Sequence, residues 1–199
     1  MAKDPTQLIE EWFAGRKADG EFVRCGRDYA YQFIPPARRG APIIYTTKAN
    51  AFAAGTAKGW SDQTFGFIGR YGLPNQADAS AIRRLVGGHK LFFLGDLDPQ
   101  DLLIFAWLRA RLRPKRIQFL GICDRYLYRL KVVLPETFHI RLSRSERRSM
   151  MLLSSVFPDL EQLIGKGCHD LLTGGRKTEL EAFVSSLAGA TSILLSDLT

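Results

Sequence analysis

The sequence predicts an α/β fold with a four-stranded parallel sheet and helices on both of its faces. Four apolar runs have the length of strands, at 41–47, 64–70, 90–96 and 116–122. Segments of about 10–15 residues with a helical pattern separate them, as in βαβ units. The runs are continuously apolar rather than alternating, which is typical of a parallel sheet that is buried on both faces.

The start of the chain is expected to form a small extension before this sheet. An amphipathic pattern predicts a short helix over 6–14 with Thr6 as its cap. Residues 21–34 have the composition of two short strands around a turn. Prolines and a basic run that ends in glycine then interrupt the pattern, so residues 1–40 are expected to be the extension and 41–199 the main domain.

Helices are predicted between the strands and throughout the C-terminal part. Those between the strands are expected over 48–57, 77–86 and 99–112. After the last strand the sequence turns helical, and helices are expected over 143–155, 158–166 and 176–189.

The composition limits the class of protein. Hydrophobic residues make up 46% of the chain, enough for a globular core, so disorder over most of the length is not expected. No apolar run approaches the roughly 20 residues that span a bilayer, and the acidic N-terminus lacks the apolar core of a signal peptide, so no membrane contact and a cytoplasmic location are expected. The three cysteines form no CxxC pair, which argues against a disulfide framework or a zinc site.

The charge balance is basic. Lys and Arg total 28 against 20 Asp and Glu, which gives a formal net charge of +8. A surplus of this size favours polyanionic partners such as nucleic acid, because phosphate contacts release counterions. It is equally compatible with a basic soluble protein that binds no polyanion.

The strongest chemical signal is a pair of acids at the end of the third predicted strand. Asp96 comes soon after the apolar run LFFL, and Asp98 precedes Pro99. In open parallel sheets ligands bind beyond the carboxyl ends of the strands, and magnesium is typically held by one or two carboxylates together with waters and phosphates. The pair therefore predicts a site for a divalent cation. Asp98 also has the position of a helix cap, whereas Asp96 has no such structural use.

The segment LFFLGDLDPQDLLIFAWLR resembles the DxD segment of the Toprim fold. It is most similar to the version in topoisomerase VI A subunits, in meiotic double-strand-break transesterases and in the nuclease subunit of Wadjet plasmid-defence systems. The resemblance covers roughly residues 41–189 and continues in order through IIYTTKANAF, PKRIQFLGICDRYLYRL, LSRSERRSMMLLSS and GRKTELEAF. It implies a Toprim (Rossmann-like) sheet, Mg²⁺ or Mn²⁺ as cofactor, DNA as partner and protein partners in a larger assembly.

The sequence departs from this family at three points. Thr47 stands where the family has a glutamate that acts as general acid–base or metal ligand, and Asp101 stands where a glycine is usual. The segment before the sheet is too short for a winged-helix domain with a transesterifying tyrosine, so cleavage through a tyrosyl–DNA link is not expected. Asp101 is expected either to add a third carboxylate to the site or to be a solvated acid in the first turn of its helix.

Further site residues follow from the resemblance and from the basic segments. Lys177 and Glu179 match the closing motif, in which the family's acid lies near the metal. Read without the family, both belong to the first turn of a helix. Basic side chains expected to contact a phosphate backbone are Lys48, Arg109, Arg113, Arg144, Arg148 and Lys177, with solvated surface positions as the alternative.

Together these observations predict a topoisomerase-like, Mg²⁺-dependent nuclease that cleaves or nicks DNA. Its catalytic residues are expected to be Asp96, Asp98 and Glu179, with Asp96, Asp98 and Asp101 as metal ligands. The alternative is a degenerate, non-catalytic Toprim domain that serves as a DNA-binding or scaffolding subunit, because the usual glutamate is missing.

Overall fold

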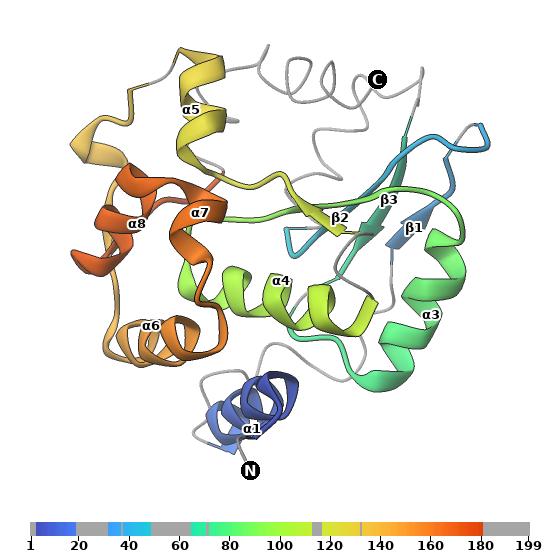
Figure 1. Ribbon diagram of the computed structural model, residues 1–199, viewed down its shortest axis with the longest axis horizontal. Coiled ribbons are helices and arrows are strands. Elements are labelled where there is room, and N and C mark those ends of the chain that lie inside the picture. The colour runs from blue at the N-terminus through green and yellow to red at the C-terminus, as the bar shows by residue number, and fades with distance from the viewer. Residues whose placement is uncertain are drawn as a thin grey trace. The chain divides into compact units, whose positions relative to one another are not determined.

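The computed structural model describes residues 3–18, 32–36, 38–48, 65–70, 72–112, 117–131 and 133–180 (Figure 1). The chain forms two compact units. Unit 1 comprises Met1–Phe93 and Ile104–Gln118, and unit 2 comprises Leu94–Leu103 and Phe119–Thr199.

Unit 1 is built on a five-stranded, mostly parallel sheet with the strand order β1-β3-β2-β4-β5. The strands are β1 Gln32–Ile34, β2 Ile43–Thr46, β3 Gly66–Gly69, β4 Leu91–Leu94 and β5 Ile117–Phe119. β2 and β3 pair in parallel, whereas β1 pairs antiparallel with β3 at the edge of the sheet. The α/β class is confirmed, but the strand count of four was wrong, because the segment before residue 40 adds β1 to the sheet.

Two of the inner strands, β2 and β3, are buried at every position, as the continuously apolar runs indicated. All four residues of β2 and all four of β3 are buried. Tyr45 of β2 stacks on Phe93 of β4 with ring centroids 5.7 Å apart, and Phe93 also contacts Phe105 at 5.5 Å. These aromatic pairs form the centre of the core of unit 1.

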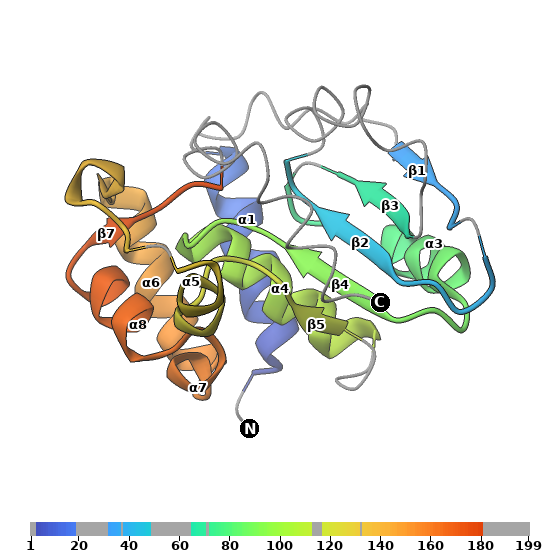
Figure 2. The ribbon, with the colours of Figure 1, turned by 90° about the horizontal axis from the view of Figure 1, so that it is seen from above.

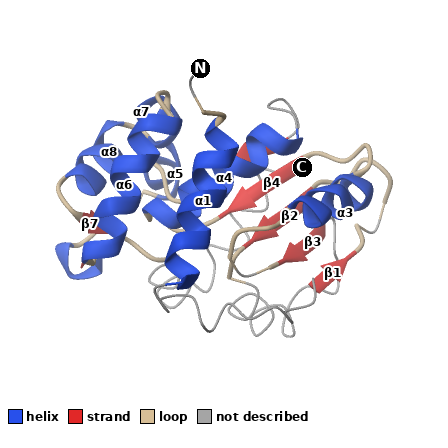
Figure 3. Ribbon diagram, turned by 90° about the horizontal axis from the view of Figure 1, so that it is seen from below, coloured by secondary structure: helices blue, strands red, loops and turns tan. Residues whose placement is uncertain are grey.

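Three of the helices that the structure describes belong wholly or partly to unit 1: α1 Pro5–Ala18, α3 Gln76–Val86 and α4 Pro99–Leu112. α3 and the part of α4 from Ile104 onward lie on the same face of the sheet (Figures 2 and 3). α1 packs against α4, because Glu10 Oε1 accepts hydrogen bonds from Trp107 Nε1 and an Arg111 guanidinium nitrogen, both at 2.8 Å. The helix predicted over 48–57 lies outside the described residues, apart from Lys48.

The cap of α1 differs from the prediction. Asp4, not Thr6, precedes the helix: its carboxylate accepts the Thr6 N–H at 3.0 Å and the Thr6 hydroxyl at 2.7 Å. Thr6 is buried in the first turn of the helix, and its hydroxyl has the Asp4 carboxylate as hydrogen-bond acceptor.

Unit 2 is mainly helical and contains a short antiparallel ribbon. Its elements are α5 Asp124–Leu130, a 3₁₀ turn at Glu136–Phe138, β6 Ile140–Arg141, α6 Arg144–Val156, α7 Leu160–Ile164, α8 Lys166–Thr173 and β7 Arg176–Lys177. β6 pairs with β7, and α8 lies beside α7 (Figure 1). The helices predicted over 143–155 and 158–166 are thereby confirmed as α6 and, in shorter form, α7.

The helix predicted from residue 176 was wrong at its start. Gly175 has a φ of +78°, a conformation that favours glycine, and its carbonyl accepts the Leu142 N–H at 2.8 Å. The chain therefore reverses after α8 and runs antiparallel to β6 instead of continuing as a helix. Residues 181–189 of the predicted helix lie outside the described residues.

Candidate functional site

An isolated antiparallel bridge brings the acidic pair next to the residues that follow β7. The Leu97 N–H donates to the Thr178 carbonyl at 3.0 Å, and the Thr178 N–H donates to the Leu97 carbonyl at 3.2 Å. Both side chains are fully buried. Because side chains alternate along extended chains, the residues on either side of Leu97 and Thr178 share the opposite face.

The register of this bridge sets which residues oppose each other. Asp98 lies across from Lys177, and Asp96 lies across from Glu179. The first pair is of opposite charge, but the second places two acids opposite one another, which is unfavourable without a cation between or beside them. The bridge thus concentrates acidic side chains in one place.

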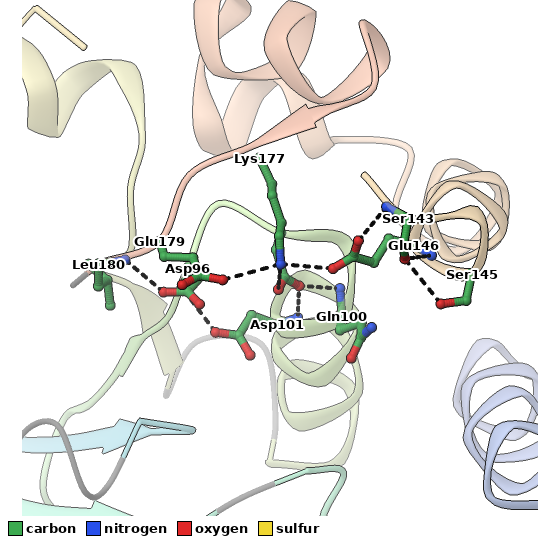
Figure 4. A network of polar contacts seen from close by, with 10 residues as sticks. Asp96, Gln100, Asp101, Ser143, Ser145, Glu146, Lys177, Glu179 and Leu180 are labelled. Carbon is green, nitrogen blue, oxygen red and sulfur yellow. Dashed lines mark hydrogen bonds and ion pairs between the residues drawn. The ribbon is translucent and has the colours of Figure 1, made fainter. Parts of the chain in front are cut away.

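Lys177 lies at the centre of this acidic cluster (Figure 4). Its ammonium nitrogen is 2.8 Å from Glu146 Oε1, 3.3 Å from Glu179 Oε1 and 4.0 Å from Asp98 Oδ2. Burial acts to lower the pKa of Lys177, but the Glu146 hydrogen bond and the charges of all three acids outweigh it and raise the pKa to about 12. Lys177 is therefore a cation throughout the physiological pH range.

Glu146 reaches the cluster from α6 and was not among the predicted site residues. It forms a capping box with Ser143: the Ser143 N–H donates to Glu146 Oε2 at 2.7 Å, and the Glu146 N–H donates to Ser143 Oγ at 3.2 Å. This leaves Oε1 for Lys177 (Figure 4). Burial opposes ionisation of Glu146, but the hydrogen bonds from Lys177 and Ser143 prevail and lower its pKa.

Asp98 has the helix-cap role that the sequence allowed. Its Oδ1 accepts the Gln100 N–H at 2.6 Å and the Asp101 N–H at 2.9 Å, so it caps α4. Its other oxygen faces Lys177. Burial raises the pKa of Asp98, and the two N–H donors and the charge of Lys177 only partly offset that effect.

Asp96 and Asp101 are also buried, and each accepts a backbone hydrogen bond. Asp96 Oδ1 accepts the Leu180 N–H at 2.8 Å, and Asp101 Oδ2 accepts the Asp96 N–H at 2.8 Å. Asp96 is 2% exposed and Asp101 is 6% exposed. Asp101 is therefore not a solvated acid of a helix's first turn, because its carboxylate fixes the backbone of the acidic segment.

The donor chemistry of the cluster suits a hard divalent cation. Asp98, Glu146 and Glu179 each turn one carboxylate oxygen toward a common point, and oxygen ligands of this kind are those that Mg²⁺ and Mn²⁺ prefer. Across the described ranges, no three Asp, Glu, His or Cys side chains are already gathered as metal ligands. The Lys177 ammonium holds the place where these oxygens converge.

The remaining predicted residues are spread over the two units. Thr47 is buried in unit 1, and Lys48, which follows it, is half-buried and donates its N–H to Thr46 Oγ1 at 3.1 Å. Arg109 is half-buried in the unit 1 part of α4. Arg144 and Arg148 are exposed on α6 in unit 2, and Arg113 lies outside the described residues. Lys177, expected to contact phosphate, instead points into the acidic cluster (Figure 4).

No model of a known protein family matches this sequence, and no curated protein matches it. What the acidic cluster can do therefore follows from its own geometry and chemistry. In the part of the chain that the structure describes, no helix is long and apolar enough to cross a membrane.

Proposed function

We propose that the protein is a Toprim-type enzyme that uses a divalent cation to cleave nucleic-acid phosphodiesters, with DNA as the substrate. One observation carries the proposal: the carboxyl groups of Asp98, Glu146 and Glu179 share a single ammonium within 4.0 Å. Buried carboxylates are normally paired or bound to metal, and three acids with one cation leave a surplus of negative charge. The raised pKa of Asp98 is the response expected of a buried carboxyl whose counter-charge is insufficient.

The residues would divide the work according to their exposure and position. Asp98 and Glu146, both largely buried, would hold Mg²⁺ or Mn²⁺, and Asp96 would fix the segment after β7 by accepting the Leu180 N–H. A bound divalent ion supplies neutralisation of charge on the phosphate and a more acidic water. The Glu179 side chain is 36% exposed, so it is the carboxylate that solvent water reaches and the one assigned as general base.

Lys177 would act as the counter-ion while no metal is bound. Its flexible stem lets the ammonium leave the carboxylates and approach a substrate phosphate once a divalent ion replaces it. Without metal, the hydrogen bond to Glu146 and the contact with Glu179 fix the position of the ammonium.

The test compares cluster variants with a matched acid elsewhere in unit 2. Asp98→Asn and Glu146→Gln keep the size of each side chain and one acceptor oxygen but remove its charge, and Asp170→Asn on the exposed surface of α8 is the control. Calorimetric titration with MnCl₂ and a plasmid-nicking assay should show binding and nicking for the parent and the control, and loss of both for the cluster variants. Absence of Mn²⁺ uptake by the parent chain at millimolar concentration would refute the proposal.

The choice of substitution matters at Asp96. Its carboxylate accepts the buried Leu180 N–H, so Asp96→Ala leaves that donor unsatisfied at a cost of about 1–3 kcal/mol. Asp96→Asn keeps an acceptor and is the variant that tests chemistry rather than folding.

A second function has its own support: a non-catalytic subunit that binds DNA or acts as a scaffold. Lys177 already supplies a cation at the centre of the cluster, and Thr47 stands where the resemblance expects a glutamate. In that case Lys177 is a permanent counter-ion and the cluster a structural one. Salt-sensitive DNA binding by a chain that takes up no Mn²⁺ and nicks no plasmid would establish this function instead.

A further inference from the structure

The β6–β7 ribbon carries two arginines that oppose each other on an exposed face. Arg141 and Arg176 are register partners in the antiparallel pair. Directly opposed residues of such a pair point to the same side with Cβ atoms about 5 Å apart, and like charges there are destabilising. Both residues are exposed. The folded chain alone therefore gives no reason for this pairing, whereas a bound anion would.

α6, which follows β6 in the chain, also carries exposed arginines. Ser145, Ser149 and Leu153 are among the residues that α6 buries, and Arg144 and Arg148 lie outside that face and share an exposed one, four residues apart. Arg144 also follows Arg141 by only three positions. Arg147 is set apart, because its Nε donates to the Leu142 carbonyl at 3.3 Å.

We call the opposed pair Arg141 and Arg176 the arginine surface. Within the described ranges, no carboxylate forms an ion pair with either side chain, whereas Lys177, the next residue after Arg176, contacts three acids. Successive residues of an extended strand face opposite sides, so Arg176 points away from the cluster into which Lys177 points.

We infer that the arginine surface binds the sugar–phosphate backbone of a nucleic acid, an inference that rests on the proposed function for its substrate class. Guanidinium groups present paired donors that match phosphate oxygens, and phosphate would remove the repulsion between Arg141 and Arg176. A nucleic-acid backbone bound there would lie on the opposite face of β7 from the acidic cluster. The assignment adds Arg141 and Arg176 to the arginines of α6 as phosphate contacts.

The experiment measures binding of the full chain to a fluorescein-labelled duplex DNA by fluorescence anisotropy in EDTA. The variant is Arg141→Ser/Arg176→Ser, and the control is Arg83→Ser/Arg84→Ser, which removes the same charge from exposed positions of α3. We expect the ribbon variant to lose about tenfold in affinity and to lower the salt slope by about 2, since each lost phosphate contact contributes close to one. The control should bind like the parent.

The outcomes separate this inference from the proposed function. Equal weakening of both double variants would overturn it, because net charge alone would then explain binding. Capture by phosphatidylglycerol vesicles, lost in the ribbon variant, with no binding of DNA, would overturn it in favour of a lipid surface. The parent could bind DNA without taking up Mn²⁺ or nicking DNA, while the ribbon variant binds DNA more weakly. That result would support the inference about the arginine surface and refute the catalytic proposal.

Discussion

Replacing Lys177 by methionine tests how strongly the acidic cluster depends on its single ammonium. Methionine keeps an unbranched apolar stem but leaves Glu146 and Asp98, whose side chains are only 11% and 13% exposed, without their cation. At about 1.4 kcal/mol per pH unit, the rise of the Lys177 pKa from 10.5 to about 12 corresponds to about 2 kcal/mol. Removal of one partner of a fully buried ion pair costs about 3–5 kcal/mol, and the partial exposure of Glu179 lowers this figure. We therefore expect the free energy of unfolding to fall by about 2–3 kcal/mol at pH 7.

The loss of stability caused by Lys177→Met should depend on pH in a defined direction. The pKa of Lys177 is raised, so its stabilising contribution is fully present at neutral pH and is lost only as the pH rises through about 12. The pKa of Glu146 is lowered, so its contribution is present at neutral pH and is lost as the pH falls below its ordinary value of 4.5. The difference between Lys177→Met and the parent should therefore shrink at about pH 4, where carboxyls that lack the ammonium take up protons.

Urea unfolding followed by circular dichroism measures this difference. Lys166→Met, at the exposed start of α8, is the control and should unfold like the parent. If the cluster binds divalent cations, MnCl₂ should restore much of the stability of Lys177→Met, because a ligand of the folded state stabilises it. A variant within about 0.5 kcal/mol of the parent at pH 7 would refute the reasoning, since changes of that size are typical of unremarkable surface positions.

Two further predictions concern the framework of unit 2 and use the same urea assay. Asp124→Ala should lower the free energy of unfolding by about 2 kcal/mol, because the Asp124 carboxylate accepts the Gly167 and Cys168 N–H groups at 2.7 and 2.8 Å at the start of α8. Asp124→Asn should lower it less, because the amide keeps one acceptor oxygen. An alanine variant as stable as the parent would contradict the capping role. Gly121→Ala should cost about 1–3 kcal/mol, because a Cβ there would lie 2.5 Å from the Gly95 carbonyl oxygen, and unchanged stability would show that the backbone can give way.

The elements around the acidic pair were predictable because their signals are local. The apolar run gave β4, and Pro99 at the first helical position after a capping Asp98 gave α4 with the predicted bounds. The Ser-x-x-Glu pattern at residues 143–146 is likewise a local signature of the start of α6. Asp96 and Asp98 could thus be named from the sequence as candidates for the site.

The rest of the cluster depends on contacts between distant parts of the chain. The segment RKTELEAF has a helical composition, yet pairing with β6 and with Leu97 makes its start extended, since tertiary contacts override weak local preference. The capping pattern locates Glu146 in its own helix but cannot reveal Lys177 as its partner. Asp124 similarly caps a helix 43 positions further along the chain.

The bridge between Leu97 and Thr178 joins two distant segments of the chain, and the acidic cluster forms only when they pair. The hydrogen bond from Leu180 to Asp96 joins residues 84 positions apart. A chain shortened before residue 176 would retain β4, both aspartates and α4, yet it would lack the ammonium, the opposing glutamate and the strand that aligns them. Whatever the cluster binds, it is therefore formed only after the polypeptide has been synthesised almost as far as residue 180.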